Sequence, residues 1–203
     1  MIAIIDYGVG NLFSLKSSLA MIGAQAVVTG NADEIRDADR LILPGVGAFA
    51  DARKKLAQNG LDKLVCEEAA RGKTIMGICL GMQMLFDKSY EYGEHEGLGL
   101  IKGSVVPMLD RLEKGLKVPH IGWNALNLKK KDHPLMKGVK EGDCVYFVHS
   151  YYAADCDEAV IATTEYGIDL TAAVARGNIL GCQFHPEKSG EVGLQILKAF
   201  CEV

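Results

Sequence analysis

The sequence predicts an α/β protein with an open, mixed and largely parallel sheet that carries helices on both faces. Three observations predict this fold class. The first half of the 203 residues alternates short apolar runs with helical patterns. Those runs are nearly continuous, as in strands buried on both faces. The second half holds further strand-like runs with little helix, which we expect to add antiparallel or mixed strands to the same sheet. No repeat, low-complexity tract or linker divides the chain, so we expect a single domain over residues 1–203.

The first half contains four expected strands with helices between them. Gly23 after the first helical pattern and Pro44 after the third strand are termination signals. The strands are expected at 1–6 (MIAIID), 24–30, 39–45 and 74–78, and the helices at 11–23 and from about 48 to 71 with a break near Gly60. Strands that alternate with helices indicate parallel neighbours.

The second half has turn residues between its apolar runs and ends in a helical pattern. Strands are expected at 103–109, 118–126, 144–153, 159–167, 171–177 and 178–185, and a final helix at 190–203. The lysines at 129–131 stand beside Asp132 and are interpreted as a solvated loop.

Composition excludes several classes of function. A net charge of -4 gives nucleic acid no general electrostatic attraction, so no nucleic-acid partner is expected. No apolar run is long enough to span a bilayer, and MIAIIDYG (1–8) has an acidic residue where a signal peptide needs its cleavage region. We therefore expect a cytoplasmic protein with no membrane partner.

The six cysteines and five histidines show no metal-ligand spacing. The cysteines are scattered without a C-x-x-C pair, which in a chain of this length favours reduced thiols over a disulfide framework. We expect neither a disulfide-built fold nor a metal site.

Cys79 stands between two glycines in GICLG (77–81), within the apolar run TIMGICLGMQMLF (74–86). A nucleophile on a sharp strand-to-helix turn needs small residues two positions to either side, because larger side chains would collide with neighbouring backbone. The periodicity after Cys79 predicts a helix, whose N-terminus would favour the thiolate. Alone, the pentapeptide leaves Cys79 either a nucleophile or a buried thiol at a strand–helix junction.

A thiolate nucleophile needs a base, and the base needs an orienting group. The segment QFHPEKS (183–189) offers both. In an extended segment His185 and Glu187 project from the same face, and Pro186 stiffens the backbone between them. A lone histidine near a strand end is commonly a surface or capping residue. Its occurrence together with the cysteine elbow favours a Cys79–His185–Glu187 triad.

A donor pair for an oxyanion is the third requirement. The glycines of LPGVGAF (43–49) allow backbone N–H groups to turn toward a ligand, and the N–H of Leu80 would be the second donor. A glycine-rich strand end is also an ordinary turn sequence. The segment YGVGNLF (7–13) lacks the third glycine of a dinucleotide-binding loop, since Phe13 occupies its place, so we reject a dinucleotide cofactor site.

With these motifs together, the whole chain resembles the triad-type, class I glutamine amidotransferases, which implies a flavodoxin-like sheet. The motifs that discriminate within this family are DYGVGNL (6–12), LPGVGAF (43–49), PHIGWN (119–124), YFVHSYY (146–152) and HPEKS (185–189). They resemble those of the glutaminase subunits of histidine biosynthesis. That resemblance implies a heterodimer in which ammonia from glutamine is passed to a (β/α)8-barrel cyclase subunit.

The resemblance also implies roles for individual residues. Cys79 would attack the side-chain amide of glutamine, His185 would relay the proton, and Glu187 would orient His185. Matching motifs further imply oxyanion-hole N–H groups from Val46 or Gly47 and from Leu80, glutamine contacts at Gly47, Gln83, Glu91, Ser150 and Tyr151, and partner contacts at Asn11, Trp123 and Lys188. No cofactor and no metal are implied.

Some alternatives stay open. The charges of SYEYGEHEG (89–97), which include Glu91, also fit a solvated loop, and Trp123 fits either an interface anchor or the core. Tyr146 and His120 either act near the site or pack. The chain could also be a paralogous subunit feeding ammonia to another synthase, or an inactive module that keeps the fold, although the intact triad argues against the latter.

Overall fold

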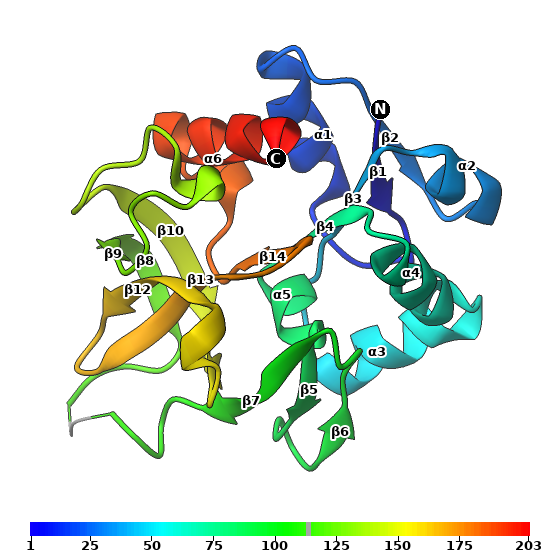
Figure 1. Ribbon diagram of the computed structural model, residues 1–203. Coiled ribbons are helices and arrows are strands. Elements are labelled where there is room, and N and C mark those ends of the chain that lie inside the picture. The colour runs from blue at the N-terminus through cyan, green and yellow to red at the C-terminus, as the bar shows by residue number, and fades with distance from the viewer. Residues whose placement is uncertain (113–114) are drawn as a thin grey trace.

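The computed structural model describes residues 1–112 and 115–203 and centres on one eight-stranded sheet (Figure 1). The strand order is β2-β1-β3-β4-β14-β13-β12-β9. The bounds are β1 Ile2–Ile5, β2 Ala26–Thr29, β3 Arg40–Leu43, β4 Thr74–Ile78, β9 Asn127–Leu128, β12 Val160–Glu165, β13 Asp169–Arg176 and β14 Ile179–Cys182. Neighbours from β2 to β14 pair in parallel, and β13, β12 and β9 continue the sheet with antiparallel pairs. The predicted mixed, largely parallel sheet is confirmed.

Helices cover both faces of this sheet, as predicted. The bounds are α1 Leu12–Met21, α2 Ala32–Asp37, α3 Phe49–Gln58, α4 Leu61–Ala70 and α6 Gly190–Glu202. Because successive strand residues point to opposite faces, Ala3 and Ile5 join the core under α2, α3 and α4, while Ile2 and Ile4 join the core under α1 and α6. Figure 1 shows α1 and α6 together on one side, away from α3 and α4.

The short helix α2 was not predicted. Its start carries a recognisable signal, since the Asn31 side chain accepts hydrogen bonds from the backbone N–H groups of Asp33 and Glu34. The helix has only six residues and buries only Ile35, so it offers little apolar periodicity to detect.

The expectation that the later runs extend the main sheet is confirmed for 159–167, 171–177 and 178–185 and wrong for 103–109, 118–126 and 144–153. β8 (His120–Ala125) and β10 (Cys144–His149) form a separate pair, and a four-stranded sheet has the order β11-β7-β5-β6. Its strands are β5 Phe86–Ser89, β6 His95–Glu96, β7 Ile101–Pro107 and β11 Tyr151–Ala154. The run expected as one strand at 144–153 breaks at Ser150, so its two halves pair with β8 and β7 and join two sheets.

The helix after Cys79 is shorter than the apolar periodicity predicted. α5 spans only Leu80–Met84, and β5 begins at Phe86, which pairs with Ile101. Helix and strand both bury every apolar residue here, so apolar content alone does not mark where one becomes the other.

None of the helices in the described ranges is both long and apolar enough to cross a membrane.

Candidate active site

Cys79 stands on a tight turn between β4 and α5. Its φ of 55° is one that residues with a side chain seldom adopt, and its backbone N–H donates to the Cys182 carbonyl on the neighbouring strand at 2.8 Å. A Cβ at position 77 would lie 2.6 Å from the backbone of Met82, and one at position 81 would lie 1.8 Å from the Leu43 carbonyl oxygen. Both glycines are therefore required where the elbow pattern predicted small residues.

His185 lies beside this thiol and is held by Glu187. The Nδ1 atom of His185 is 2.8 Å from Oε1 of Glu187, and both side chains are almost completely buried. Burial lowers the pKa of His185, but its hydrogen bonds to Cys79 and Glu187 and their charges outweigh burial and raise that pKa to about 9. The imidazole is therefore biased toward its protonated form, as a proton donor to a leaving group must be.

The reason for the His185–Glu187 contact differs from the expected one. The two residues do not lie in an extended segment, because His185 precedes a short 3₁₀ turn, η3 (Pro186–Lys188). The turn folds the chain back, so the Ser189 hydroxyl donates to the His185 carbonyl at 2.6 Å. Pro186 begins this turn, where its fixed φ and missing N–H cost nothing.

A cavity of about 400 Å³ opens above Cys79 and brings together all five residues expected to bind glutamine. Its lining includes Cys79 and His185 of the expected triad and the expected oxyanion and substrate residues Val46, Gly47, Leu80, Gln83, Glu91, Ser150 and Tyr151. Glu187 lies behind His185 and does not line it. Val46 is partly exposed and Gly47 has a φ of +87°.

Glu91 lines this cavity and is hydrogen-bonded to the start of α3. Its Oε2 accepts the backbone N–H of Phe49, the first residue of α3, and its own N–H donates to the Ser89 hydroxyl at 3.2 Å. The carboxylate is thus anchored to the segment that follows Gly47, and the alternative of a purely solvated loop is wrong for this residue.

Gln83 is oriented by two acceptors. Its Nε2 donates to the Tyr151 carbonyl at 3.1 Å and to Oε1 of Gln183 at 3.0 Å. With both amide hydrogens used inside the protein, Oε1 of Gln83 is its group left for a ligand in the cavity.

Of the partner residues expected from the sequence, Lys188 lines this cavity, and Trp123 is connected to Lys188 through Tyr146. The Nζ atom of Lys188 lies 5.7 Å from the centre of the Tyr146 ring, which packs edge-on against Trp123 at 6.2 Å. Trp123 is 57% exposed, so the alternative of core burial is wrong. Asn11 precedes α1 without capping it through its side chain.

Four residues near Cys79 were not expected from the sequence. Gln183 donates from Nε2 to Cys79 Sγ at 3.7 Å, the Val148 carbonyl lies 3.9 Å from that sulfur, and His149 and Pro119 line the cavity. QFHPEKS begins with Gln183, but its contact with Cys79 needs a turn that the sequence pattern does not show. His120, left open between site and packing, is buried against His149 and does not line the cavity.

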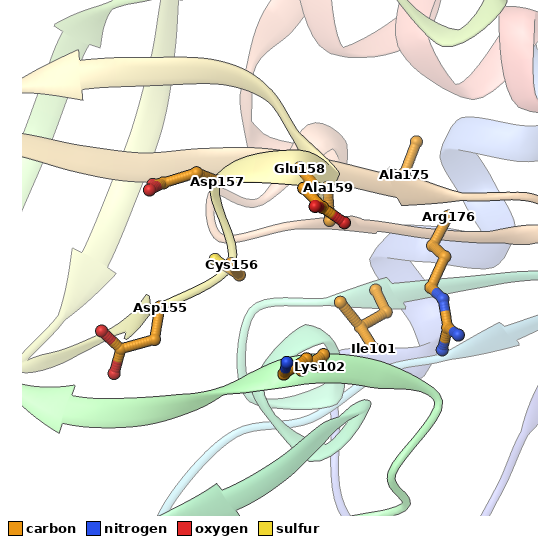
Figure 2. A pocket seen from close by; sticks show the side chains of 9 residues that line it. All are labelled: Ile101, Lys102, Asp155, Cys156, Asp157, Glu158, Ala159, Ala175 and Arg176. Atoms are coloured by element: carbon orange, nitrogen blue, oxygen red, sulfur yellow. The ribbon is translucent and has the colours of Figure 1, made fainter.

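A second cavity of about 530 Å³ lies between β7, the segment after β11, and β13 (Figure 2). It contains Cys156, but no histidine lines it, and burial raises the pKa of this thiol to about 11. A neutral thiol without a base is no nucleophile. Within residues 1–112 and 115–203 no three histidine, cysteine, aspartate or glutamate residues cluster as a metal site would need.

Comparison with known proteins agrees with the geometry. The family model "Glutamine amidotransferase class-I" matches residues 3–202. The chain is 52% identical over 204 residues to "Imidazole glycerol phosphate synthase subunit HisH" of Caldanaerobacter subterraneus subsp. tengcongensis, covering 100% of this chain and 98% of that protein. It is 48% identical over 205 residues to the protein of the same name from Wolinella succinogenes, covering 100% of both chains.

Solved structures share the fold at low sequence identity. "Structure of PurLQS from Thermotoga maritima" matches with a TM-score of 0.77 and 22% identity over 99% of this chain and 97% of that one. A "Crystal structure of glutamine amidotransferase" matches with a TM-score of 0.76 and 20% identity over 99% and 100%. The chain therefore belongs to the class I glutamine amidotransferases and, within them, to the imidazole glycerol phosphate synthase subunits HisH.

Proposed function

We propose that this chain, acting as one glutaminase domain, hydrolyses glutamine to glutamate and ammonia with a Cys79–His185–Glu187 triad. The observation that carries the proposal is the arrangement of Cys79 on its turn, with His185 beside it and Glu187 bound to Nδ1 of His185. The cavity above the thiol has room for an amino acid and is lined by both hydrogen-bond donors and acceptors.

In the first half of the reaction, the thiolate of Cys79 attacks the side-chain carbonyl carbon of glutamine. The N–H groups of Leu80 and of Val46 or Gly47 stabilise the resulting oxyanion. The imidazolium of His185 gives its proton to the amide nitrogen, so the carbon–nitrogen bond breaks and ammonia leaves a glutamyl thioester behind.

In the second half, the neutral imidazole of His185 removes a proton from water, and the hydroxide attacks the thioester carbon. The carbon–sulfur bond breaks, glutamate leaves and the Cys79 thiolate is restored, with the proton on His185. Glu187 keeps the imidazole oriented and stabilises its positive charge throughout.

The substrate is held by its two ends. Glu91 would bind the ammonium group of glutamine, and Gly47, Gln83, Ser150 and Tyr151 would bind its polar groups. All five residues line the cavity, and the hydrogen bonds that fix Gln83 leave its Oε1 for the ligand.

The ammonia is delivered to a partner. The relatives are named as subunits of imidazole glycerol phosphate synthase, and we infer that the partner is the (β/α)8-barrel cyclase subunit in histidine biosynthesis. Lys188 lines the cavity, the exposed Trp123 packs against Tyr146 next to it, and both residues, with Asn11, would contact the partner. A free glutaminase would waste ammonia, so the isolated chain is expected to turn over slowly.

Glutamate release with and without the cognate cyclase and its nucleotide substrate tests this function. We expect glutamate release to accelerate strongly in the complex and Cys79→Ala to release no glutamate in either condition. Full activity of the isolated chain would contradict partner dependence, and an active Cys79→Ala variant would contradict the assignment of the nucleophile.

A further inference from the structure

A chain of hydrogen bonds runs from a backbone carbonyl to the sulfur of Cys79. The Tyr151 carbonyl accepts from Nε2 of Gln83 at 3.1 Å, Oε1 of Gln183 accepts from the same nitrogen at 3.0 Å, and Nε2 of Gln183 lies 3.7 Å from Cys79 Sγ. The two glutamines are 100 positions apart in the sequence, and Gln183 directly follows β14.

Only one orientation of the two glutamine amides satisfies every donor and acceptor in this row of hydrogen bonds. A backbone carbonyl only accepts, so Gln83 must turn its NH₂ group toward Tyr151. The same nitrogen of Gln83 also donates to Gln183, so the amide oxygen of Gln183 must be the acceptor. The NH₂ group of Gln183 is consequently forced toward Cys79 Sγ, and reversing it would set two NH₂ groups against each other.

The surroundings hold Gln183 in place. It is fully buried, Gln83 is 6% exposed, and the backbone N–H of Gln183 donates to the Ala172 carbonyl on β13 at 2.8 Å. Within hydrogen-bond distance Cys79 Sγ also has the Val148 carbonyl at 3.9 Å, an acceptor that suits the neutral thiol but offers nothing to the thiolate. A fixed N–H donor is what the thiolate needs on this side.

We propose that Gln183 is a catalytic residue that stabilises the Cys79 thiolate by donating from Nε2 to its sulfur, held in that orientation by Gln83 and the Tyr151 carbonyl. The inference rests on the proposed function of Cys79 and adds a group to it. Gln83 then has two tasks, since it faces the ligand with its oxygen and fixes the thiolate donor with its nitrogen. Hydrogen bonds to charged groups are stronger than neutral ones, so this single donor affects reactivity measurably.

The test is the rate of alkylation by iodoacetamide of the full chain, followed for each cysteine by peptide mass spectrometry. Iodoacetamide reads thiolate reactivity without needing the glutamine contacts. Gln183→Met keeps the length of the side chain and removes the donor, and Cys144 is an exposed thiol that serves as an internal reference. Cys182→Ala, the fully buried neighbour on β14, is the matched control for a packing change at this point.

We expect Gln183→Met to slow alkylation of Cys79 about 10-fold or more, with Cys144 unchanged and Cys182→Ala within about 2-fold of the parent chain. In glutaminase assays of the complex, kcat for glutamine should fall much more than KM rises. Gln83→Met frees the amide of Gln183 to rotate, so it should slow alkylation less than Gln183→Met, and it tests the inference even where Gln183→Met fails to fold.

Alkylation of Cys79 at the parent rate in folded Gln183→Met or in Gln83→Met would overturn the inference. So would an equal loss in Cys182→Ala, since the effect would then come from packing. If Cys79 in the unaltered chain reacts no faster than Cys144, the proposed nucleophile itself is wrong, and that outcome is distinct from the others.

Discussion

His120 and His149 face each other across the antiparallel pair β8–β10, with Nδ1 of His120 3.1 Å from Nε2 of His149. The other nitrogen of His149, Nδ1, lies 2.9 Å from the Tyr151 carbonyl, so it must carry a hydrogen. Nε2 of His149 then accepts from His120. A proton added to His149 would set two N–H groups against each other, so this pair needs His149 neutral.

Acid should therefore destabilise the fold through His149. Burial lowers its pKa to about 4, against an ordinary value of 6.5, and outweighs the hydrogen bond to the Tyr151 carbonyl, which raises the pKa. His120 and His185 add smaller lowering effects on this pKa. A lowered pKa means that the unfolded chain takes up a proton below pH 6.5 while the folded chain does not until near pH 4. The contribution of neutral His149 to the free energy of unfolding is thus fully present above pH 6.5, and up to about 3 kcal/mol of it is lost as the pH falls toward 4.

Urea unfolding at pH 7.5 and pH 4.5 measures this loss. His149→Asn keeps a donor for the Tyr151 carbonyl but does not titrate, so it should lose clearly less stability over this interval than the parent chain. His95→Asn, outside the pair, is the control and should lose as much as the parent. Equal losses in all three proteins would show that His149 is not the titrating group.

Replacing Glu187 by glutamine should cost activity rather than structure. The amide oxygen that Glu187→Gln introduces can still accept from Nδ1 of His185, but the negative charge that helps to raise the pKa of His185 is gone. We expect the pKa of His185 to fall and kcat to drop about 100-fold or more. An NMR titration of His185 beside glutaminase kinetics checks both effects. Glu141→Gln is the control for a charge change at the surface. An unchanged kcat together with a lowered pKa of His185 would show that Glu187 has no part in the mechanism.

Replacing Gly81 by alanine should destabilise the tight turn that carries Cys79. A Cβ there would meet the Leu43 carbonyl oxygen at 1.8 Å, and both Gly81, in α5, and Leu43, at the end of β3, are buried. Gly81→Ala should lower the free energy of unfolding by about 3 kcal/mol or more. Gly8→Ala, at a φ of +84° with no heavy atom within 4 Å of the new carbon, should cost only about 1 kcal/mol. Similar costs at both positions, measured by chemical unfolding, would contradict the packing argument.

Trp123 should matter for the partner and not for the fold. Its side chain is 57% exposed, so Trp123→Ala should change the free energy of unfolding by less than about 0.5 kcal/mol. Exposed tryptophans that become buried in an interface are frequent hot spots, and we expect Kd for the cyclase subunit to rise about 10-fold or more. Met21→Ala, similarly exposed at the far end of α1, should leave Kd unchanged in calorimetry. An unchanged Kd for Trp123→Ala would move the interface elsewhere.

The parallel half of the fold could be predicted because strand and helix patterns there are local. Residues such as Ile2 to Ile5 are apolar on both faces, which only a covered sheet explains. The assignment of the later strands to sheets could not be predicted. Ser150 separates two strands that join different sheets, and nothing in the run 144–153 shows which strand each half will meet.

Part of the candidate site could likewise be predicted from the sequence, and part of it could not. The elbow around Cys79 and the neighbours His185 and Glu187 are visible because their spacing is short. Gln183 and His149 are not, because their contacts depend on how separate segments fold together. The short α5 also weakens the expected help from a helix dipole, since five residues sum few peptide dipoles.

Labelling of the full chain with 6-diazo-5-oxo-L-norleucine, an electrophilic analogue of glutamine, asks directly whether Cys79 is the nucleophile. We predict one adduct per chain, on Cys79 alone among the six cysteines, with loss of glutaminase activity in proportion and protection by glutamine. Labelling of another cysteine in its place, or complete labelling of Cys79 with activity retained, would exclude Cys79 from that role.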